Sequence, residues 1–369
     1  MTTPEREYNG IMNNVYSQIP TYEQCLEIVA DCKAFSHSSQ EVDGNKVESF
    51  KYNIVLPGMW DGFGRLNMRG ITFVNGELGA LPFPKFFNCG EHENSTNVDF
   101  TTSKYINEKI DGSLISVFEI NGKLYLKTMK SVYSDVAKWA TENVTKDVLE
   151  ISKSLLDSGL SPIFEYVSPQ SRVVLSYDKP DFYFLGARSM SNGAILFPEI
   201  HLEVPSCIKV PKVFASHEEM SEYVEKDDVE GVVVTLDNGI MVKVKSADYC
   251  RIHRILSNFT PKNIVENFIN NTYDDMIGVL TFNELTGDVE KARKVAEDFL
   301  LRFDEIVTEA EEYYNANKHR ERKDIALELM GKGGNRPLGA LVFRLIDGKE
   351  INTMVSTRIL EESKEWNFS

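Results

Sequence analysis

The chain has 369 residues, of which 42% are hydrophobic and 26% charged, and its formal net charge is −16. This length allows a sizeable core in two domains, and the acidic balance argues against broad, nonspecific nucleic-acid binding but not against a local basic channel. The five scattered cysteines and six histidines show no C-x-x-C spacing or paired motif, which argues against a disulfide framework and a structural zinc site. We expect any metal ion to be a hard cation held by carboxylates.

The sequence shows no signal for secretion or membrane insertion. No stretch approaches 18 consecutive apolar residues, and the N-terminal segment MTTPEREYNGIMNNVY lacks a basic region followed by an apolar one. We therefore expect a cytoplasmic protein that does not associate with membranes.

In chain order, the pattern first predicts a helix over residues 22–35 and then a strand-rich region. Three segments in this region consist of a β-branched or aromatic run, an Asn-Gly and another such run: ITFVNGEL at 71–78, LISVFEINGKLYLKT at 114–128 and VVVTLDNGIMVKVK at 232–245. Because Asn-Gly accepts positive φ at both turn positions, each is predicted to be a hairpin with a two-residue type I′ turn. The region also contains a helical stretch near 134–157 and strand candidates at 162–168 and 182–188.

The pattern changes after Asp248, where helical periodicity replaces the hairpins. Helices are predicted over residues 292–307, 321–330 and 338–345. The segment GKGGNRPLG at 331–339 lacks the G-x-x-x-x-G-K-[S/T] spacing of a phosphate-binding loop, so we interpret it as an inter-helix loop. The predicted fold class is α+β, with antiparallel sheets and flanking helices in residues 1–248 and an all-helical domain in residues 249–369.

One candidate for chemistry lies in EKIDGSL, where Lys109 precedes Asp111 and Gly112 at the start of a predicted hairpin. By itself, K-x-D-G is expected by chance in about one chain in ten of this length. Taken alone, the motif therefore favours a solvated lysine beside a turn aspartate over a nucleophile, and other motifs must decide.

Three further motifs follow in the chain. Glu165 lies in the apolar and aromatic run PIFEYVS, where a carboxylate either faces water or belongs to a site, and Glu230 precedes Gly231 in VEGVVV. In MVKVK, the two-residue alternation of a strand places Lys243 and Lys245 on one face. Two like charges on one strand face are tolerated in water, as on an edge strand, or opposite an anion such as a polyphosphate.

The order K-x-D-G, F-E, E-G-V-V-V and V-K-V-K resembles the motif series of covalent nucleotidyltransferases, and most of all that of the bacteriophage RNA ligase 1 family. The segments MRGITF and PKFFNCGE resemble upstream elements of that family, and FEYVSPQSRVVLSY and EGVVVTLDNGIMVKVKSADY resemble its later motifs. The resemblance covers most of residues 45–369. It implies a nucleotidyltransferase (ATP-grasp-like ligase) domain, a helical C-terminal domain that determines RNA specificity, and a bacteriophage source, hence the host-cell cytoplasm.

The resemblance implies an ATP-dependent RNA ligase. Lys109 would attack the α-phosphorus of ATP to form lysyl-AMP, AMP would pass to an RNA 5′-phosphate, and a 3′-hydroxyl would then displace it, as in the repair of nicked tRNA. The physical chemistry is compatible, because an amine nucleophile must be neutral and neighbouring cations such as Lys243 and Lys245, with a divalent metal, depress its pKa. The same cations neutralise the phosphate charge during transfer.

The resemblance also implies which residues bind nucleotide and metal. The catalytic residues are Lys109, Glu165, Glu230, Lys243 and Lys245. The nucleotide-binding residues are Arg69, Lys85, Lys109, Asp111, Gly112, Glu165, Glu230, Lys243, Lys245 and Tyr249. The ligands for Mg²⁺ or Mn²⁺ are Glu165, Glu230, Asp274 and Asp275. A structural salt bridge for Arg69 and a helix N-cap for the Tyr-Asp-Asp at 273–275 are alternative interpretations.

Other functions and contacts stay open at this point. A DNA ligase or an mRNA capping guanylyltransferase is the main alternative, but both usually carry an OB-fold where this chain has a helical pattern. A non-catalytic RNA-binding protein on the same scaffold is the second alternative. We expect a monomer whose partner is RNA with 5′-phosphate and 3′-hydroxyl ends, and the cluster KHRERK at 318–323 either contacts RNA phosphates or forms a solvated helix face.

Overall fold

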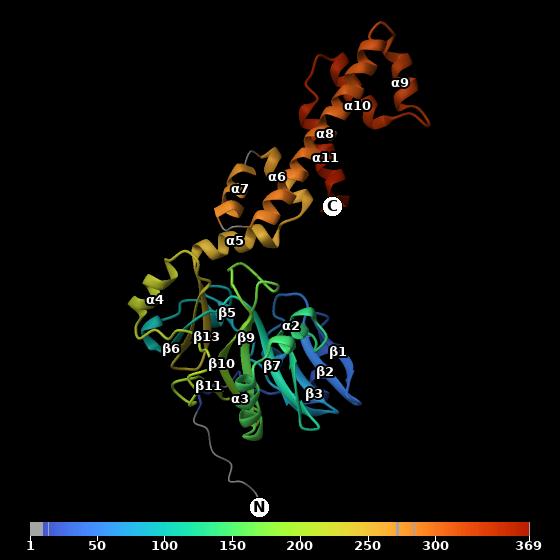
Figure 1. The fold of residues 1–369 in the computed structure, drawn as a ribbon. Helices are drawn as coiled ribbons and strands as arrows, with labels where there is room; N and C mark the ends of the chain where they lie inside the picture. Colours follow the sequence, from blue (N-terminus) through green and yellow to red (C-terminus); the bar gives the residue numbers. More distant parts are fainter. Residues whose placement is uncertain (1–9, 14, 271–272, 283–284, 369) are drawn as a thin grey trace, which may run out of the picture. The chain divides into compact units, whose positions relative to one another are not determined.

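A computed structural model describes residues 10–13, 15–270, 273–282 and 285–368, with only the backbone described for residues 254, 257, 275, 278, 279 and 282. The chain divides into two compact units, Met1–Cys250 and Arg251–Ser369 (Figure 1). The boundary lies two residues beyond the one predicted after Asp248. Among the described residues, no helix is long and apolar enough to cross a bilayer.

The first unit begins with an antiparallel four-stranded sheet in the order β1-β2-β3-β4. Its strands are β1 (Phe35–Val42), β2 (Asn45–Tyr52), β3 (Ile71–Val74) and β4 (Glu77–Ala80). Helix α1 (Tyr22–Asp31) packs against this sheet and starts with a capping box between Thr21 and Gln24. The predicted helix over 22–35 was therefore too long at its C-terminal end, because Phe35 already begins β1.

Two further sheets complete the first unit, in the orders β5-β13-β12-β6 and β11-β10-β9-β7-β8. The first contains β5 (Phe87–Asn88), β6 (Ser103–Glu108), β12 (Gly231–Leu236) and β13 (Met241–Lys245). The second contains β7 (Ser113–Ile120), β8 (Lys123–Lys127), β9 (Leu160–Val167), β10 (Asp181–Ser189) and β11 (Ile195–Leu196). All pairings are antiparallel except that of β5 with β13.

Helices cover these sheets, and short 3₁₀ turns connect the strands. Helix α2 (Asp135–Asn143) packs on β8, α3 (Lys146–Asp157) on β9 and β7, and α4 (His217–Val224) on β12 (Figure 1). The single helix predicted near 134–157 is thus two helices, because Thr145 caps the start of α3 with its side chain. The 3₁₀ turns are η1 (Arg65–Asn67), η2 (Glu93–Ser95) and η3 (Phe100–Thr102).

The Asn-Gly turns confirm two of the three predicted hairpins in detail. Asn75-Gly76 and Asn121-Gly122 both have positive φ at the two turn positions and join β3 to β4 and β7 to β8. The third turn was predicted wrongly, because Leu236 accepts a backbone hydrogen bond from Gly239 and donates one to Ile240, and only Gly239 has positive φ. This is a three-residue loop over 237–239, in which the asparagine stays outside the left-handed region.

The second unit contains only helices and short turns in its described part. Its elements are α5 (Ala247–Ser257, which crosses the boundary), α6 (Pro261–Ile269), α7 (Tyr273–Phe282), α8 (Thr286–Asn317), α9 (Arg322–Met330), α10 (Arg336–Ile346), α11 (Asn352–Glu362) and η4 (Ser363–Glu365). The long helix α8 packs against α6, α7, α10 and α11 and supplies much of the apolar core. Residues 331–335 connect α9 to α10, so the interpretation of GKGG as an inter-helix loop is confirmed.

Candidate active site

A pocket of about 220 Å³ is lined by strands of the five-stranded sheet and of the β5-β13-β12-β6 sheet in the first unit. Its apolar walls come from Phe83, Phe86, Leu114, Leu185, Phe197, Val233 and Met241. Its charged lining includes Arg69, Lys109, Glu165 and Lys243. With Gly112, which also lines it, five of the predicted site residues share one cavity, and its apolar surface suits a flat aromatic ligand.

Lys109 lies in the connection between β6 and β7 and so between the two sheets. Its backbone N–H donates to the carbonyl of Gly231 at 2.9 Å. Its ammonium Nζ lies 2.7 Å from Oε2 of Glu230, and Nζ of Lys245 lies 3.0 Å from Oε1 of the same carboxylate. The buried Glu230 thus holds the candidate nucleophile and one motif lysine at the same time.

Two glycines make this arrangement possible. Gly231 has a φ of +140°, and a Cβ there would lie 2.1 Å from the carbonyl oxygen of Val244 on the neighbouring strand. A Cβ on Gly112 would lie 2.5 Å from the carbonyl oxygen of Tyr166. The glycines of the E-G and K-x-D-G motifs are therefore required for the close approach of neighbouring backbones.

Glu165 enters the pocket from β9 and is only 9% exposed. Burial raises the pKa of its carboxyl group to about 7, an effect that the positive charge of Lys109 partly offsets. Among the described residues, no ion pair or hydrogen bond to its carboxylate is found. Its oxygens are therefore free to accept hydrogen bonds from a ligand or to coordinate a cation.

Lys243 enters the same pocket from β13 with its ammonium 4.7 Å from the centre of the Phe86 ring. Burial lowers the pKa of this ammonium to about 6. Neighbouring cations lower the pKa further, and these are Arg69, Lys85, Lys109 and Lys245. In the described part of the chain Lys243 forms no ion pair, so an anionic ligand would supply its missing partner.

The two upstream basic residues are placed differently. Arg69 lines the pocket and donates to the carbonyl of Phe83 at 3.4 Å, and no salt bridge to it is found among the described residues. Lys85 is 7% exposed and forms an ion pair with Glu91 at 3.2 Å, outside the pocket lining. A phosphate contact by Lys85 thus needs this ion pair to open and remains a prediction.

Asp111 and Tyr249 are part of the support behind the nucleophile. The Tyr249 hydroxyl donates to Oδ1 of Asp111 at 2.8 Å, and the backbone N–H groups of Val174 and Leu175 donate to Oδ2 at 2.8 and 2.6 Å. Lys245 also lies 4.6 Å from the centre of the Tyr249 ring. Both carboxylate oxygens of Asp111 are engaged by the protein, so a direct nucleotide contact by Asp111 or Tyr249 remains a prediction.

The comparison with known proteins supports the family that the order of the motifs suggested. The family model described as RNA ligase matches residues 67–249, the segment that carries every predicted site residue except Asp274 and Asp275. This chain belongs to that RNA ligase family. The resemblance to the bacteriophage RNA ligase 1 family, the expected ligase fold class and the enzyme class are therefore confirmed.

Individual relatives of this RNA ligase are moderately similar to it. A putative RNA ligase of Thermovibrio ammonificans is 28% identical over 267 residues, which cover 66% of this chain and 70% of the relative. RNA ligase 1 of bacteriophage TS2126 is 26% identical over 299 residues, covering 76% and 73% of the two chains. A solved archaeal ATP-dependent RNA ligase has a TM-score of 0.49 at 13% identity, covering 79% of this chain and 81% of its own.

Some residues of the ligase pocket were not predicted from sequence. Phe83, Phe86 and Phe197 form much of its aromatic wall, and only the position of Phe86 next to Lys85 offered a signal. The aromatic residues Phe50 and Tyr52 of the upstream strand β2 contact other aromatic side chains and do not line the pocket.

The structure does not test the predicted metal ligands of the second unit, Asp274 and Asp275. Asp274 is exposed on α7, and the side chain of Asp275 lies outside the described residues. A metal role for either residue therefore remains a prediction.

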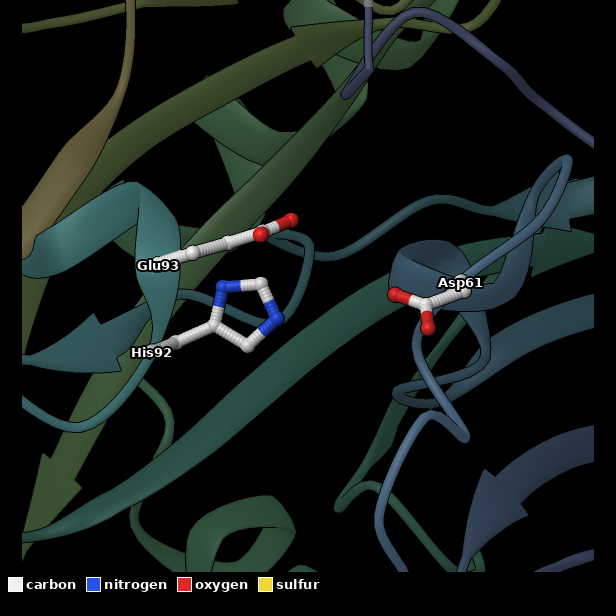
Figure 2. A group of neighbouring side chains, drawn as sticks. All are labelled: Asp61, His92 and Glu93. Atoms are coloured by element: carbon white, nitrogen blue, oxygen red, sulfur yellow. The ribbon is translucent and has the colours of Figure 1, made fainter.

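A separate cluster of Asp61, His92 and Glu93 could in principle hold a cation, because one ligand atom from each lies within 4.8 Å of the others (Figure 2). However, the backbone N–H of Asn94 donates to Nδ1 of His92, which places the ring proton on Nε2. The ring also stacks on Phe87 at 4.1 Å between centroids. These contacts give His92 a structural role as the N-cap of η2. We therefore assign no metal to this cluster.

Proposed function

We propose that this protein is an ATP-dependent RNA ligase that joins 5′-phosphate and 3′-hydroxyl ends through a lysyl-AMP intermediate at Lys109. The observation that carries the proposal is the position of Lys109, whose amine lies in a pocket together with Lys243 and Glu165, two charged groups without an ion-pair partner in the described part of the chain. An amine nucleophile, a cation for phosphate and an acceptor for hydroxyl groups are the groups that adenylyl transfer from ATP requires.

In the first step, the nitrogen lone pair of Lys109 attacks the α-phosphorus of ATP, and the bond to the bridging oxygen breaks so that pyrophosphate leaves. The nitrogen must lose its proton to become nucleophilic. Glu230, at 2.7 Å, is the nearest acceptor for that proton. Lys243 and Arg69 face the same cavity and would neutralise the negative charge on the phosphates.

In the second step, an oxygen of the RNA 5′-phosphate attacks the same phosphorus, the P–N bond breaks, and Lys109 regains a proton. In the third step, the RNA 3′-hydroxyl attacks the 5′-phosphorus, its proton is lost, and AMP leaves. The adenine would lie between the apolar walls, such as those of Phe86 and Phe197, and Glu165 would accept hydrogen bonds from the ribose hydroxyls.

A divalent cation, Mg²⁺ or Mn²⁺, fits this donor set. Glu165 has an uncommitted buried carboxylate, and Glu230 offers a second one once its lysine partners exchange toward the phosphates. When bound, the cation supplies positive charge to the phosphate oxygens. The residues of this chain then orient the substrate and exclude water from the pocket.

The finer aspects of the proposal rest on the family. We propose that the substrate is RNA with broken ends, such as nicked tRNA, that the protein acts as a monomer in the cytoplasm, and that the helical unit Arg251–Ser369 determines RNA specificity. The helical second unit favours an RNA ligase over a DNA ligase or a capping guanylyltransferase, because those enzymes usually carry an OB-fold at this point.

The test is covalent labelling. The protein is incubated with ATP or GTP labelled at the α-phosphate and a divalent metal and is then run on a denaturing gel. We expect label from ATP, none from GTP, and none in Lys109→Ala. Absence of labelling by ATP with Mg²⁺ and with Mn²⁺ would contradict the proposal, and labelling by GTP would indicate a capping enzyme.

A second assay separates the ligase types. Single-stranded RNA with a 5′-phosphate is offered alongside DNA of the same sequence, and circular products are separated on a gel. We expect circular RNA in excess over circular DNA. The reverse preference would favour a DNA ligase. Adenylylation without any joined product would support only the nucleotidyltransferase step of the proposed reaction.

A further inference from the structure

Arg188 on β10 is a buried cation that the proposed reaction does not use. Its side chain is 0% exposed, and burial lowers the pKa of its guanidinium to about 9, which leaves it charged at neutral pH. Among the described residues, no carboxylate lies within ion-pair distance of it. Instead it donates only to neutral oxygens of four separate segments.

The guanidinium donates hydrogen bonds to all four segments. Nη1 donates to the side-chain oxygen of Asn67 at 2.8 Å and to the carbonyl of Pro82 at 2.7 Å. Nη2 donates to the carbonyl of Tyr16 at 2.8 Å and to that of Gly193 at 3.3 Å. A buried charge without a counter-charge is costly, and an apolar side chain would fill the space at less cost. We therefore interpret the role of Arg188 from the chain segments that its guanidinium N–H groups link together.

Two of the connected segments lead to basic residues, namely Arg69 in the pocket lining and Lys85, which precedes the pocket residue Phe86. Asn67 lies two residues before Arg69, and Pro82 lies just before Phe83, whose carbonyl accepts a hydrogen bond from Arg69. The same two segments meet again where the N–H of Lys85 donates to the carbonyl of Leu66 at 2.7 Å. Arg188 thus lies behind the segments that carry Arg69 and Lys85.

The Tyr16 contact extends the network to the third cation. The Tyr16 hydroxyl accepts a hydrogen bond from the N–H of Met241, the first residue of β13, at 3.3 Å. Two residues later the same strand presents Lys243 to the pocket. The amide of Asn67 also donates to the carbonyl of Tyr16 at 3.1 Å and so closes the network.

We propose that Arg188 is a positioning residue that aligns Arg69, Lys85 and Lys243 for the polyphosphate of ATP, without touching the nucleotide itself. The inference rests on the proposed function, because it assigns these cations to the phosphates. It predicts that loss of Arg188 weakens recognition of the β- and γ-phosphates much more than recognition of the adenosine.

The experiment compares two nucleotides by equilibrium binding in the presence of Mg²⁺. The probes are α,β-methylene-ATP, which cannot be cleaved by attack of Lys109, and AMP, which lacks the β- and γ-phosphates. For Arg188→Met we expect the Kd of the ATP analogue to rise about tenfold while that of AMP changes less than about twofold. Arg188→Lys keeps the charge but has no planar fork, so we expect an intermediate Kd for the analogue.

A stability-matched control makes the readout specific. Leu155→Ala removes a buried side chain from α3, away from the pocket lining, and should lower the melting temperature while leaving both Kd values unchanged. All titrations are run below the melting transition of every variant. Equal weakening of both nucleotides in Arg188→Met, or no change in either, would overturn the inference. If the wild-type protein binds neither probe, the proposed function fails first.

Discussion

The two units of this protein differ in the burial and the ion pairing of their charged residues. In the first unit, Glu165 and Arg188 are buried and Lys243 is half-buried, and none of them has an ion-pair partner among the described residues. In the second unit, the described ion pairs, such as Arg320–Glu328 and Arg322–Asp347, join partly or fully exposed side chains. Exposed pairs contribute little to stability, whereas unpaired buried charges are destabilising. Unpaired buried charge therefore marks the unit in which chemistry takes place.

The largest expected effect follows from removing the nucleophile of the first unit. Lys109→Ala should abolish covalent adenylylation, because no other amine in the pocket has a carboxylate proton acceptor at hydrogen-bond distance among the described residues. Labelling with α-labelled ATP measures the effect. Lys104→Ala, which changes an exposed lysine on β6, the strand that precedes Lys109, is the matched control and should label like the wild type.

The next effect tests the tight backbone packing around the site. Gly231→Ala should lower the free energy of unfolding by about 2 kcal/mol or more, because φ is +140° and the new Cβ meets the Val244 carbonyl. Gly44→Ala has a positive φ but open space around the Cβ, and should cost about 1 kcal/mol. Urea denaturation measures both. Equal losses in the two variants would show that the close approach at Gly231 is unimportant.

A smaller effect tests the unpaired lysine through pH. At about pH 8 the Lys243 amine, with a pKa of about 6, is mostly neutral in the free protein, and a bound triphosphate favours its charged form. Binding of α,β-methylene-ATP should therefore take up protons, and affinity should fall as the pH rises above about 6. Glu165, with a pKa of about 7, is largely ionised at about pH 8 and contributes little there.

Calorimetry in two buffers of different ionisation enthalpy measures this proton uptake. Lys243→Arg is the matched control, because a guanidinium stays charged throughout and should bind the analogue without the uptake. Net proton release by the wild type, or identical uptake in the arginine variant, would show that Lys243 is already charged in the free protein.

The smallest effect concerns the basic cluster of the second unit. Replacing Lys318, Arg320, Arg322 and Lys323 together by alanine should leave ATP-dependent adenylylation within about twofold of the wild type and change stability little, because exposed ion pairs contribute little to it. Two of these cations, Arg320 and Arg322, already pair with carboxylates. If RNA affinity also stayed constant, the hypothesis that this cluster contacts RNA should be dropped.

Local signals carried the sequence predictions that succeeded. Asn75-Gly76 and Asn121-Gly122 predicted their turns because the left-handed conformation is a property of the residues themselves. The loop over 237–239 escaped the same rule, because one extra residue lets Gly239 alone take the left-handed position. Turn chemistry indicated that a hairpin forms here, but not its loop length.

Long-range contacts explain what the sequence left open. The alternation of β13 predicted that Lys243 and Lys245 share a face. It did not predict that Lys245 would pair with Glu230 while Lys243 has no ion-pair partner within the described ranges. Lys109 and Glu230 are 121 residues apart, and only the motif order suggested that they belong together. Arg188 gave no signal at all, because an arginine in an amphipathic strand normally faces water.

Mapping the adenylylated residue tests the central claim most directly. The protein is incubated with ATP and a divalent metal, digested under conditions that preserve a phosphoramidate, and its peptides are analysed by mass spectrometry. The account predicts AMP on the lysine of the EKIDGSL peptide, at Lys109, and on no other residue. AMP attached to Lys85, Lys243 or Lys245 instead, or its absence from every peptide of a protein that joins RNA ends, would contradict it.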